Sequence, residues 1–355
     1  MHSPRHQPAP RVSIVIPHFN GKDILFSCLQ SLRSDAFPEK EIIVVDNAST
    51  DGSGIAAEKA FPEIERLQPD RNLGYAGGCN FGVAAARAPY VVLLNNDTIV
   101  EPGWLSHLLE ALLSKPEIAA VQPKIKSLVE KDLFDYAGAA GGFLDVLGFP
   151  FARGRIFFTI EKDRGQYDDP VPVFWASGTC ILLKKQIFND LGGLDHTFFA
   201  HMEEIDLNWR MQLAGHQLLF VPCARIFHSA GSTLKMNSPR KVYFNHRNNL
   251  LMLMKNYSAG TLLWVLPLRM GMEAAALLFS LLKGEIKQAL AVPTAWLAAG
   301  RALPHVFQTR KMIRKMRRRS DRDVMKLMYP GSIVIQYFLF RKRTFKLLNW
   351  KPELK

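Results

Sequence analysis

Three carboxylates crowd into the run HMEEIDLNWR, which begins at His201. Glu203, Glu204 and Asp206 fall in the first turn of a predicted helix. Acidic residues stabilise a helix N-terminus, and Asp206 can pair with Arg210 one turn later, so helix formation explains part of this charge. Two adjacent carboxylates beside a third are nevertheless more than a helix end needs, and their repulsion would raise the pKa of one of them. A carboxylate with a raised pKa suits a general base, which is the functional alternative.

Two other side chains are candidates for a metal site. Asp97 ends the run LLNND after a predicted strand, and a carboxylate in that position can hold a hard divalent cation. His228 lies in RIFHSAGST among small residues that leave room for a bound group. Each has an ordinary alternative, because an Asp after a strand also serves a turn or a helix cap, and a single His is more often structural than a ligand.

Two segments could contact a nucleotide. Asp46 opens DNASTDGS at the end of a predicted strand, where it can accept hydrogen bonds from a base or a ribose, or simply begin a turn. Residues 71–82 read RNLGYAGGCNFG, and four glycines in twelve residues allow a ligand to approach the backbone amides closely. The spacing matches neither a P-loop nor a dinucleotide fingerprint, and an ordinary glycine-rich turn is the alternative.

Alternating strand-like and helix-like segments in the first half of the chain would position these residues. The predicted strands are residues 12–17, 41–46, 90–94 and 118–122, and the predicted helices are residues 24–32 and 80–87. This alternation predicts an α/β fold with a mostly parallel central sheet that is covered on both faces. Ligands bind beyond the carboxyl ends of such strands, where Asn20, Asp46 and Asp97 stand. Residues 126–169 show weak periodicity and predict loops and hairpins, whereas residues 174–185 return to strand character.

In their order and spacing these motifs resemble family 2 glycosyltransferases, in particular the branch of bacterial rhamnosyltransferases and related cell-envelope sugar transferases. The segments that carry the resemblance are VSIVIPHFN, VVDNASTDGS, RNLGYAGGCNFG, LLNND, ASGTCILLKKQIFNDLGGLD, FFAHMEEIDLNWR and RIFHSAGST. They cover about residues 11–233 of the 355. The resemblance implies the GT-A fold, a nucleotide-binding α/β sandwich.

The resemblance also implies a donor site. Asp46 would contact the nucleobase, and the glycine-rich loop would pack on the ribose and the diphosphate. Asp97 matches the last acid of the family's DxD motif and would bind Mg²⁺ or Mn²⁺, with His228 as the second metal ligand. Asn95 stands where many members have Asp, so a ribose contact there would be neutral. The residues assigned to the nucleotide sugar are Pro17, Asn20, Asp46, Arg71, Asn72, Gly74, Tyr75, Gly77, Gly78, Asn80, Asn95 and Asn96.

The acid pair aligns with the family's Glu-Asp motif, whose second member acts as the base. That member is Glu204 here, one methylene longer than Asp, and Glu203 is its alternative. Trp175, Gly178 and Asp206 are placed on the acceptor side. The implied reaction is a single inverting displacement that moves a sugar, for which rhamnose is the candidate, from a nucleoside diphosphate to a hydroxyl of a glycan or a lipid-linked acceptor. One carboxylate suffices for it, so the paired-carboxylate logic of glycosidases does not apply.

Two other classes of protein stay open on the residues alone. A sugar nucleotidyltransferase also uses an α/β nucleotide-binding sheet, but it needs basic residues for a triphosphate near the first strand. The segment PHFNGKD supplies only Lys22. A non-catalytic scaffold or nucleic-acid-binding protein would use the basic tail described next and leave the acids without a chemical role.

The net charge of +13 conceals an asymmetry along the chain. Residues 1–230 carry 21 Lys+Arg against 27 Asp+Glu, whereas residues 231–355 carry 24 against 5. Such a tail binds something anionic. Because long apolar stretches at residues 261–282 and 289–303 accompany the charge, the composition favours an anionic membrane surface over nucleic acid.

The apolar stretch 261–282 is long enough to span a bilayer, but Pro267, Arg269 and Glu273 interrupt it. We therefore expect helices that lie in the membrane interface, helped by the basic run at residues 310–319. A soluble helical subdomain that packs on the catalytic core or on a second copy of the chain is the alternative.

The expected organisation is a flexible N-terminus (residues 1–10), a GT-A domain (residues 11–235) and a helical, basic region (residues 236–355). Four cysteines without a CxxC pair and an N-terminus without an apolar segment predict a cytoplasmic protein, peripheral on the inner face of the plasma membrane.

Overall fold

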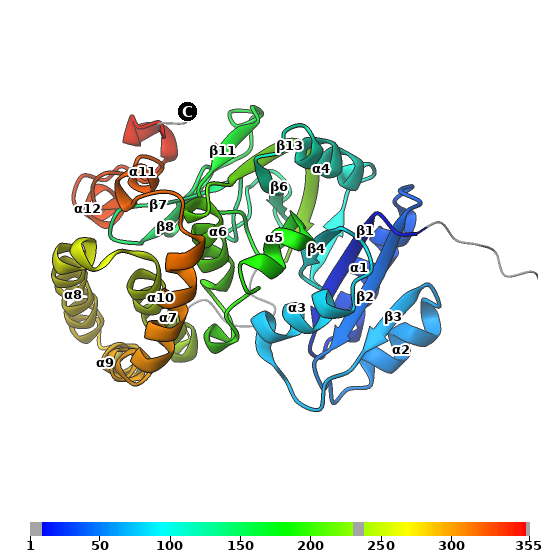
Figure 1. Ribbon diagram of the computed structural model, residues 1–355, viewed down its shortest axis with the longest axis horizontal. Helices are drawn as coiled ribbons and strands as arrows, with labels where there is room; N and C mark the ends of the chain where they lie inside the picture. The colour runs from blue at the N-terminus through cyan, green and yellow to red at the C-terminus, as the bar shows by residue number, and fades with distance from the viewer. Residues whose placement is uncertain (1–8, 230–237, 353–355) are drawn as a thin grey trace, which may run out of the picture.

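A large mixed β-sheet forms the centre of the molecule (Figure 1). The computed structural model describes residues 9–229 and 238–352. The strands of this sheet are β1 (Val12–His18), β2 (Lys40–Asp46), β3 (Ile64–Leu67), β4 (Tyr90–Leu94), β5 (Thr98–Val100), β6 (Ile118–Ser127), β11 (Val171–Val173), β12 (Cys180–Lys184) and β13 (Gln217–His228). They lie in the order β11-β13-β6-β12-β4-β1-β2-β3, and β5 pairs with β13. The predicted α/β fold is confirmed.

The two halves of the sheet differ in strand direction. The ladders β1–β2, β1–β4 and β2–β3 are parallel. In the other half β12 runs antiparallel to both β4 and β6, while β13 runs parallel to β6. All seven residues of β1 are buried, because helices cover both faces of the parallel half, and this explains its continuous apolar sequence.

Helices pack on both faces of the sheet and create two apolar clusters. The helices of this region are α1 (Lys22–Ser34), α2 (Ser53–Ala60), α3 (Gly74–Ala85), α4 (Trp104–Leu113), α5 (Lys185–Asp190) and α6 (Glu203–Leu213), with the 3₁₀ turn η1 (His196–Phe198). Helix α3 begins well before the predicted residue 80, so most of the glycine-rich segment is helical. It lies so close to the sheet that a Cβ at Gly82 would come within 2.4 Å of Val15 and 2.9 Å of Val45.

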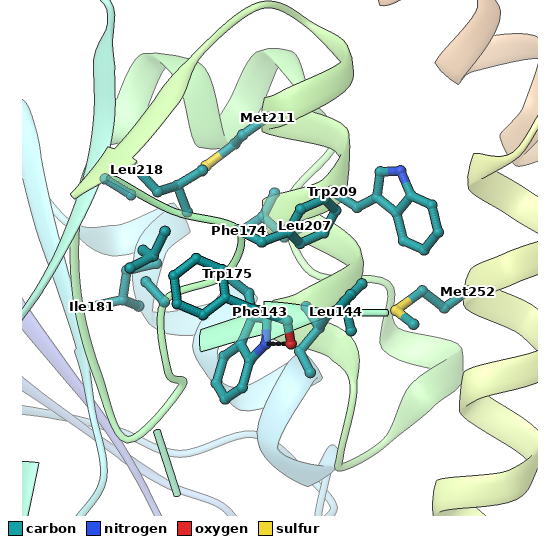
Figure 2. Packing of buried hydrophobic residues seen from close by; sticks show 14 of the residues in the cluster. Phe143, Leu144, Phe174, Trp175, Ile181, Leu207, Trp209, Met211, Leu218 and Met252 are labelled. Atoms are coloured by element: carbon teal, nitrogen blue, oxygen red, sulfur yellow. Dashed lines mark hydrogen bonds between the residues drawn. The ribbon is translucent and has the colours of Figure 1, made fainter. Parts of the chain in front are cut away.

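The segment predicted as loops and hairpins contains a second, small sheet. Its strands are β7 (Gly142–Leu144), β8 (Pro150–Ala152), β9 (Arg155–Ile156) and β10 (Thr159–Ile160), all antiparallel. Figure 2 shows how this sheet joins the main core: Trp175 packs beside Phe143 and donates a 2.8 Å hydrogen bond from Nε1 to the Phe143 carbonyl. The predicted strand at residues 174–185 is shorter than expected, because only β12 forms a ladder, Trp175 makes a single bridge to Gly142, and α5 begins at Lys185.

The C-terminal region is helical and shares an apolar core with the part of the chain that forms the main sheet. It contains α7 (Pro239–Asn256), α8 (Ala259–Leu282), α9 (Ile286–Arg301), α10 (Leu303–Met316), α11 (Asp321–Met325), α12 (Ile333–Phe338) and the turn η2 (Phe345–Leu348). Met252 of α7 belongs to the same apolar cluster as Leu144 and Trp209 (Figure 2). Helix α8 lies at the edge of the molecule opposite β3 (Figure 1). Most of the predicted flexible N-terminus, and the start of the predicted C-terminal region, lie outside the described residues.

Candidate active site

A cleft of about 600 Å³ opens where the strand ends of the main sheet meet α6, the small sheet and α7. It gathers predicted residues from segments far apart in the chain. The predicted residues that line it are Pro17, Asn72, Gly74, Tyr75, Asn95, Asn96, Asp97, Trp175, Gly178, Glu203, Glu204 and His228. The cleft therefore brings the candidate base and both candidate metal ligands into one cavity.

Asp97 and His228 meet because their strands pair. His228 ends β13 opposite Thr98, the first residue of β5, so Asp97 lies directly beside it. His228 Nε2 is 3.1 Å from Asp97 Oδ1. On its other side, His228 Nδ1 is 2.9 Å from Asp135 Oδ1, and Asp135 is almost fully buried. Asp135 was not predicted, because it lies in the segment of weak periodicity and its partner is 93 residues away.

The electrostatics of this end suit a cation. Burial works against a charged imidazole, but Asp135 and Asp97 outweigh burial and raise the pKa of His228 to about 10 in the metal-free protein. The described residues contain no group of three or more His, Cys, Asp or Glu side chains that could enclose a metal. A carboxylate and an imidazole whose far nitrogen is held by a second carboxylate are nevertheless a donor set that fits Mg²⁺ or Mn²⁺. Two protein ligands leave room for oxygens of a bound diphosphate.

The acid pair stands at the start of α6, in the wall of the same cleft. Among the described residues, Glu203 Oε2 and Glu204 Oε2 have no hydrogen-bond partner, although both atoms are buried. Burial raises the pKa of both carboxyl groups, and repulsion from Glu204 raises the pKa of Glu203 further. Both carboxyl groups therefore bind a proton more tightly than a free glutamate does, which suits a group that accepts a proton from a bound hydroxyl.

Tyr75 and Gly178 hold the acid pair against the sheet. The Tyr75 hydroxyl donates a hydrogen bond to the Gly178 carbonyl. A Cβ on Gly178 would lie 3.3 Å from that hydroxyl oxygen and 3.5 Å from Glu204 Cβ. Burial raises the pKa of Tyr75, and the nearby Glu203 adds to the effect, so the phenol stays neutral beside the carboxylates.

The loop before α6 is strained and is held by a residue that the sequence did not reveal. Phe199, His201 and Met202 all have positive φ values (62°, 69° and 72°), which cost energy for residues other than glycine. The buried Asn248 of α7 donates from Nδ2 to the carbonyls of Phe198, Ala200 and His201 at 2.8–3.0 Å. Asn248 thus fixes the loop that places the acid pair.

The structure corrects the prediction that the glycine-rich loop presents free amides to phosphate. The amides of Tyr75 and Ala76, in the first turn of α3, both donate to the Phe199 carbonyl, at 2.8 and 3.3 Å. A Cβ on Gly78 would lie 2.7 Å from the side chain of Asn47, so this glycine serves packing. Gly77 and Gly78 do not line the cleft.

Asn80 and Asp206 are also corrected. Both ends of the Asn80 amide bond to the backbone of Leu194, at 2.7 and 3.0 Å, so the side chain ties α3 to the GGLD segment and not to a nucleotide sugar. Asp206 is fully buried and is not on the acceptor side. Its carboxylate bonds to Lys255, Arg210 and Asn256 at 2.8–3.0 Å.

Three further predicted residues stand outside the lining of the cleft. The Asp46 carboxylate accepts a 3.0 Å hydrogen bond from the Ser49 amide and lies 3.6 Å from Arg66. Asn20 has a positive φ of 57° and bonds to Thr50, which shapes the loop between β1 and α1. Arg71 is exposed. Their assignment to the nucleotide stays a prediction.

Comparison with solved structures defines the class of fold. A crystal structure of GalNAc-T7 with UDP, GalNAc and Mn²⁺ superposes with a TM-score of 0.56 at 16% identity, over 71% of this chain and 49% of that one. A mannosyltransferase from Pyrobaculum calidifontis in complex with GDP-Man and Mn²⁺ gives a TM-score of 0.50 at 15% identity, over 87% of this chain and 85% of that one. The chain has the GT-A fold, as predicted.

Sequence comparison gives the family. Residues 13–192, half of the chain, match the family model described as glycosyl transferase family 2, and the chain belongs to this family. It is similar to N-acetylglucosaminyl-diphospho-decaprenol L-rhamnosyltransferase of Mycobacterium tuberculosis, with 29% identity over 246 residues, which are 64% of this chain and 78% of that protein. The predicted family is confirmed, and glycosyl transfer is supported over nucleotidyl transfer or a non-catalytic role.

Proposed function

We propose that the protein is an inverting glycosyltransferase that moves a sugar from a nucleoside diphosphate to a hydroxyl of a glycan or lipid-linked acceptor in cell-envelope synthesis. One observation carries the proposal. Glu204 has a buried carboxylate oxygen without a partner, in the same cleft as Asp97 and His228. A base and a metal-binding pair in one cavity are the two parts that a single displacement at the anomeric carbon needs.

Each part of the cleft has a role in this reaction. Asp97 and His228 would hold Mg²⁺ or Mn²⁺, which neutralises the charge of the leaving diphosphate when bound. Asp135 holds His228 in the orientation that presents Nε2 to the cleft. Glu204 accepts the proton of the acceptor hydroxyl. Trp175 and Gly178 shape the wall next to Glu204.

L-Rhamnose is the sugar we propose, and a lipid-linked saccharide the acceptor. Both follow from the relative of Mycobacterium tuberculosis, whose name specifies an L-rhamnosyl donor group and a diphospho-decaprenol acceptor. Thermal stabilisation of the full chain by dTDP-, UDP- and GDP-sugars, each with Mg²⁺ or Mn²⁺, tests the donor. Stabilisation by one nucleotide sugar, and its hydrolysis or transfer, is expected. Activity that survives chelation with EDTA would refute the roles of Asp97 and His228.

The C-terminal region supplies the proposed membrane contact. Helix α8 is the one helix among the described residues that is long and apolar enough to cross a membrane. Its Arg269 and Glu273 point inward, however: Arg269 donates to the Leu147 carbonyl at 3.1 Å, and His246 Nδ1 lies 2.5 Å from Glu273 Oε2. A helix that is tied to the catalytic half in this way is placed to lie on a membrane and not to cross it.

The outer face of α8 is apolar and has cations beside it. Leu263, Leu268 and Leu282 are 81%, 56% and 79% exposed. Phe279 of α8 lies 6.5 Å from Phe338 of α12, so the two helices share this face, and the Lys283 ammonium lies 4.5 Å from the Phe279 ring. Apolar side chains flanked by lysine and arginine suit the cytoplasmic surface of an anionic bilayer.

Flotation with liposomes tests the membrane contact. Binding to vesicles of anionic phospholipid at low salt, and weaker binding at high salt or to neutral vesicles, is the expected result. Substitution of Leu263 and Leu282 by Gln should reduce flotation without loss of the fold, because both side chains are exposed. Failure of the wild-type chain to float would instead favour a soluble region that packs on a second copy of the chain.

A further inference from the structure

Arg155 on β9 is a buried arginine without a partner. It is 7% exposed and lines the cleft. Within residues 9–229 and 238–352 its guanidinium has no hydrogen bond and no ion pair, and the buried Nε atom has no acceptor. Its one described interaction is a stack on the Tyr136 ring, at 4.5 Å from the ring centre. An uncompensated buried charge is costly, so its presence in a cavity points to a ligand.

Arg153, in the turn between β8 and β9, shows what a structural arginine looks like. It is equally buried, at 4% exposure, but its Nη2 lies 2.5 Å from Asp169 Oδ1. The two side chains differ in direction and in partner: Arg153 is neutralised by the protein, whereas Arg155 faces the cleft.

A second cation lies close to the same tyrosine ring. Lys241 Nζ of α7 is 5.2 Å from the centre of the Tyr136 ring. In the described part of the chain its ammonium has no carboxylate within ion-pair distance either. Burial, with a smaller contribution from Lys241, lowers the pKa of His201 to about 4, so the ammonium lies near the loop that precedes the acid pair. Arg155, Tyr136 and Lys241 are called the Tyr136 cluster below.

The Tyr136 cluster is close to the proposed metal site and to the acid pair. Tyr136 directly follows Asp135, the residue that bonds to His228 at the metal end. Lys241 lies near His201, two residues before Glu203. A group bound here would therefore lie between the diphosphate end and the base.

We propose that the Tyr136 cluster is a phosphate-binding site in which Arg155 contacts a substrate diphosphate. The planar guanidinium offers two parallel N–H donors to phosphate oxygens, and an ammonium adds a second charge. The proposal rests on the proposed function for its substrates. Two substrates have this chemistry: the nucleoside diphosphate of the donor and the diphosphate of a lipid-linked acceptor.

Inorganic pyrophosphate is the probe, with the full chain and calorimetry in the absence of metal. Arg155→Gln should weaken pyrophosphate binding at least tenfold, and Arg155→Lys should weaken it less. Arg33→Gln, which removes the same charge from an exposed pair with Glu63, should bind like wild type. Equal binding by wild type and Arg155→Gln, or no binding by either, would overturn the proposal.

Thermal melting of the unliganded variants separates ligand binding from a structural role. Arg155→Gln should melt at the wild-type temperature or above it, because it removes an unpaired buried charge. Arg153→Gln should melt lower, because it loses the ion pair with Asp169 and the contacts with the Tyr167 and Phe220 rings. A drop of several degrees for Arg155→Gln would show that the side chain supports the fold, and the proposal would then be wrong.

Two further titrations identify the source of the diphosphate. UDP, dTDP and GDP with Mn²⁺ report on the donor, and farnesyl diphosphate reports on a lipid-linked acceptor. Weaker binding of a nucleotide by Arg155→Gln assigns the site to the donor, and weaker binding of farnesyl diphosphate assigns it to the acceptor. If neither changes, the proposal fails. A wild-type chain that binds pyrophosphate but neither hydrolyses nor transfers any nucleotide sugar would refute the proposed function and leave the phosphate site standing.

Discussion

Helix α6 carries two kinds of buried acid within one turn. Glu203 and Glu204 face the cleft, and each has a buried oxygen without a partner among the described residues. Asp206 faces the opposite way, and three side chains from α6 and α7 bond to its carboxylate. All three acids follow from the same short sequence, so burial alone does not distinguish them. The distinguishing feature is whether the protein itself neutralises the charge.

The same contrast holds between two arginines that line the cleft. Arg269 also lines the cleft, but its guanidinium donates to Glu273 Oε1 at 2.6–2.9 Å, and that pair holds the pKa of Glu273 at about 2 against the effect of burial. In the wall, Arg155 has no such partner in the described chain. We infer that the unpaired charges of the cleft are left for substrates and for the transferred proton to neutralise, whereas the Arg269–Glu273 pair holds the helices together.

The largest expected effect is on turnover. Glu204→Gln removes the proposed base and should lower kcat by about 10²–10⁴-fold, the usual contribution of general-base catalysis. The melting temperature should change little, because Glu204 Oε2 has no partner to lose and Gln keeps nearly the same shape. Steady-state assays with donor and acceptor measure kcat, and thermal melts measure the melting temperature. Full activity in Glu204→Gln would show that Glu204 is not the base.

Asp206→Ala should show the reverse pattern. The substitution leaves Arg210 and Lys255 buried without their shared carboxylate, and the expected loss is about 3–5 kcal/mol of unfolding free energy. Urea titration of the full chain measures it. Protein that remains folded should keep its affinity for the donor. If Asp206→Ala had wild-type stability and lost only its activity toward the acceptor, Asp206 would belong to the acceptor side after all.

These acids show what the sequence predicts and what it does not. Local patterns identified β1, β2, β4 and β6, because a strand buried on both faces must be apolar throughout. The acid pair, Asp97 and His228 could be proposed from the sequence, because their residue types and positions relative to strands and helices are local properties. The direction in which a side chain points is not local.

The errors and omissions of the sequence analysis concern residues whose contacts are set by the three-dimensional fold and not by the local sequence. Asp206 was misplaced because its partner Lys255 is 49 residues away. Asn80 was misplaced because Leu194, 114 residues later, takes its amide. Asp135 and Arg155 were missed because they lie in the segment of residues 126–169, where short strands give no clear period. No local signal in the sequence marks them.

A smaller effect is expected at the metal end. Asp135 holds the far nitrogen of His228, so Asp135→Ala should weaken Mn²⁺ binding by about 10–100-fold without removing a ligand. Asp132→Asn is the matched control, because Asp132 lies in the same segment but pairs with Lys162 at the surface. Titration with Mn²⁺ in the presence of nucleoside diphosphate measures both variants. Equal affinity in Asp135→Ala and wild type would place Asp135 among the structural acids.

Glu203→Gln should have the smallest effect on turnover, and its effect on stability should depend on pH. Burial and repulsion from Glu204 raise the pKa of Glu203, and Gln has nearly the shape of the protonated acid, so kcat should change by less than about threefold. Because the pKa of Glu203 is raised in the folded state, the wild-type chain loses stability as pH rises above the unfolded value of about 4.3. The variant has no carboxyl group at this position, and its advantage should grow by about 1.4 kcal/mol per pH unit until the folded pKa is reached. Urea titrations between pH 4 and pH 8 measure this difference. A constant difference across that range would mean that Glu203 is neutralised within the protein, as Asp206 is, and that the wall holds one functional acid and not two.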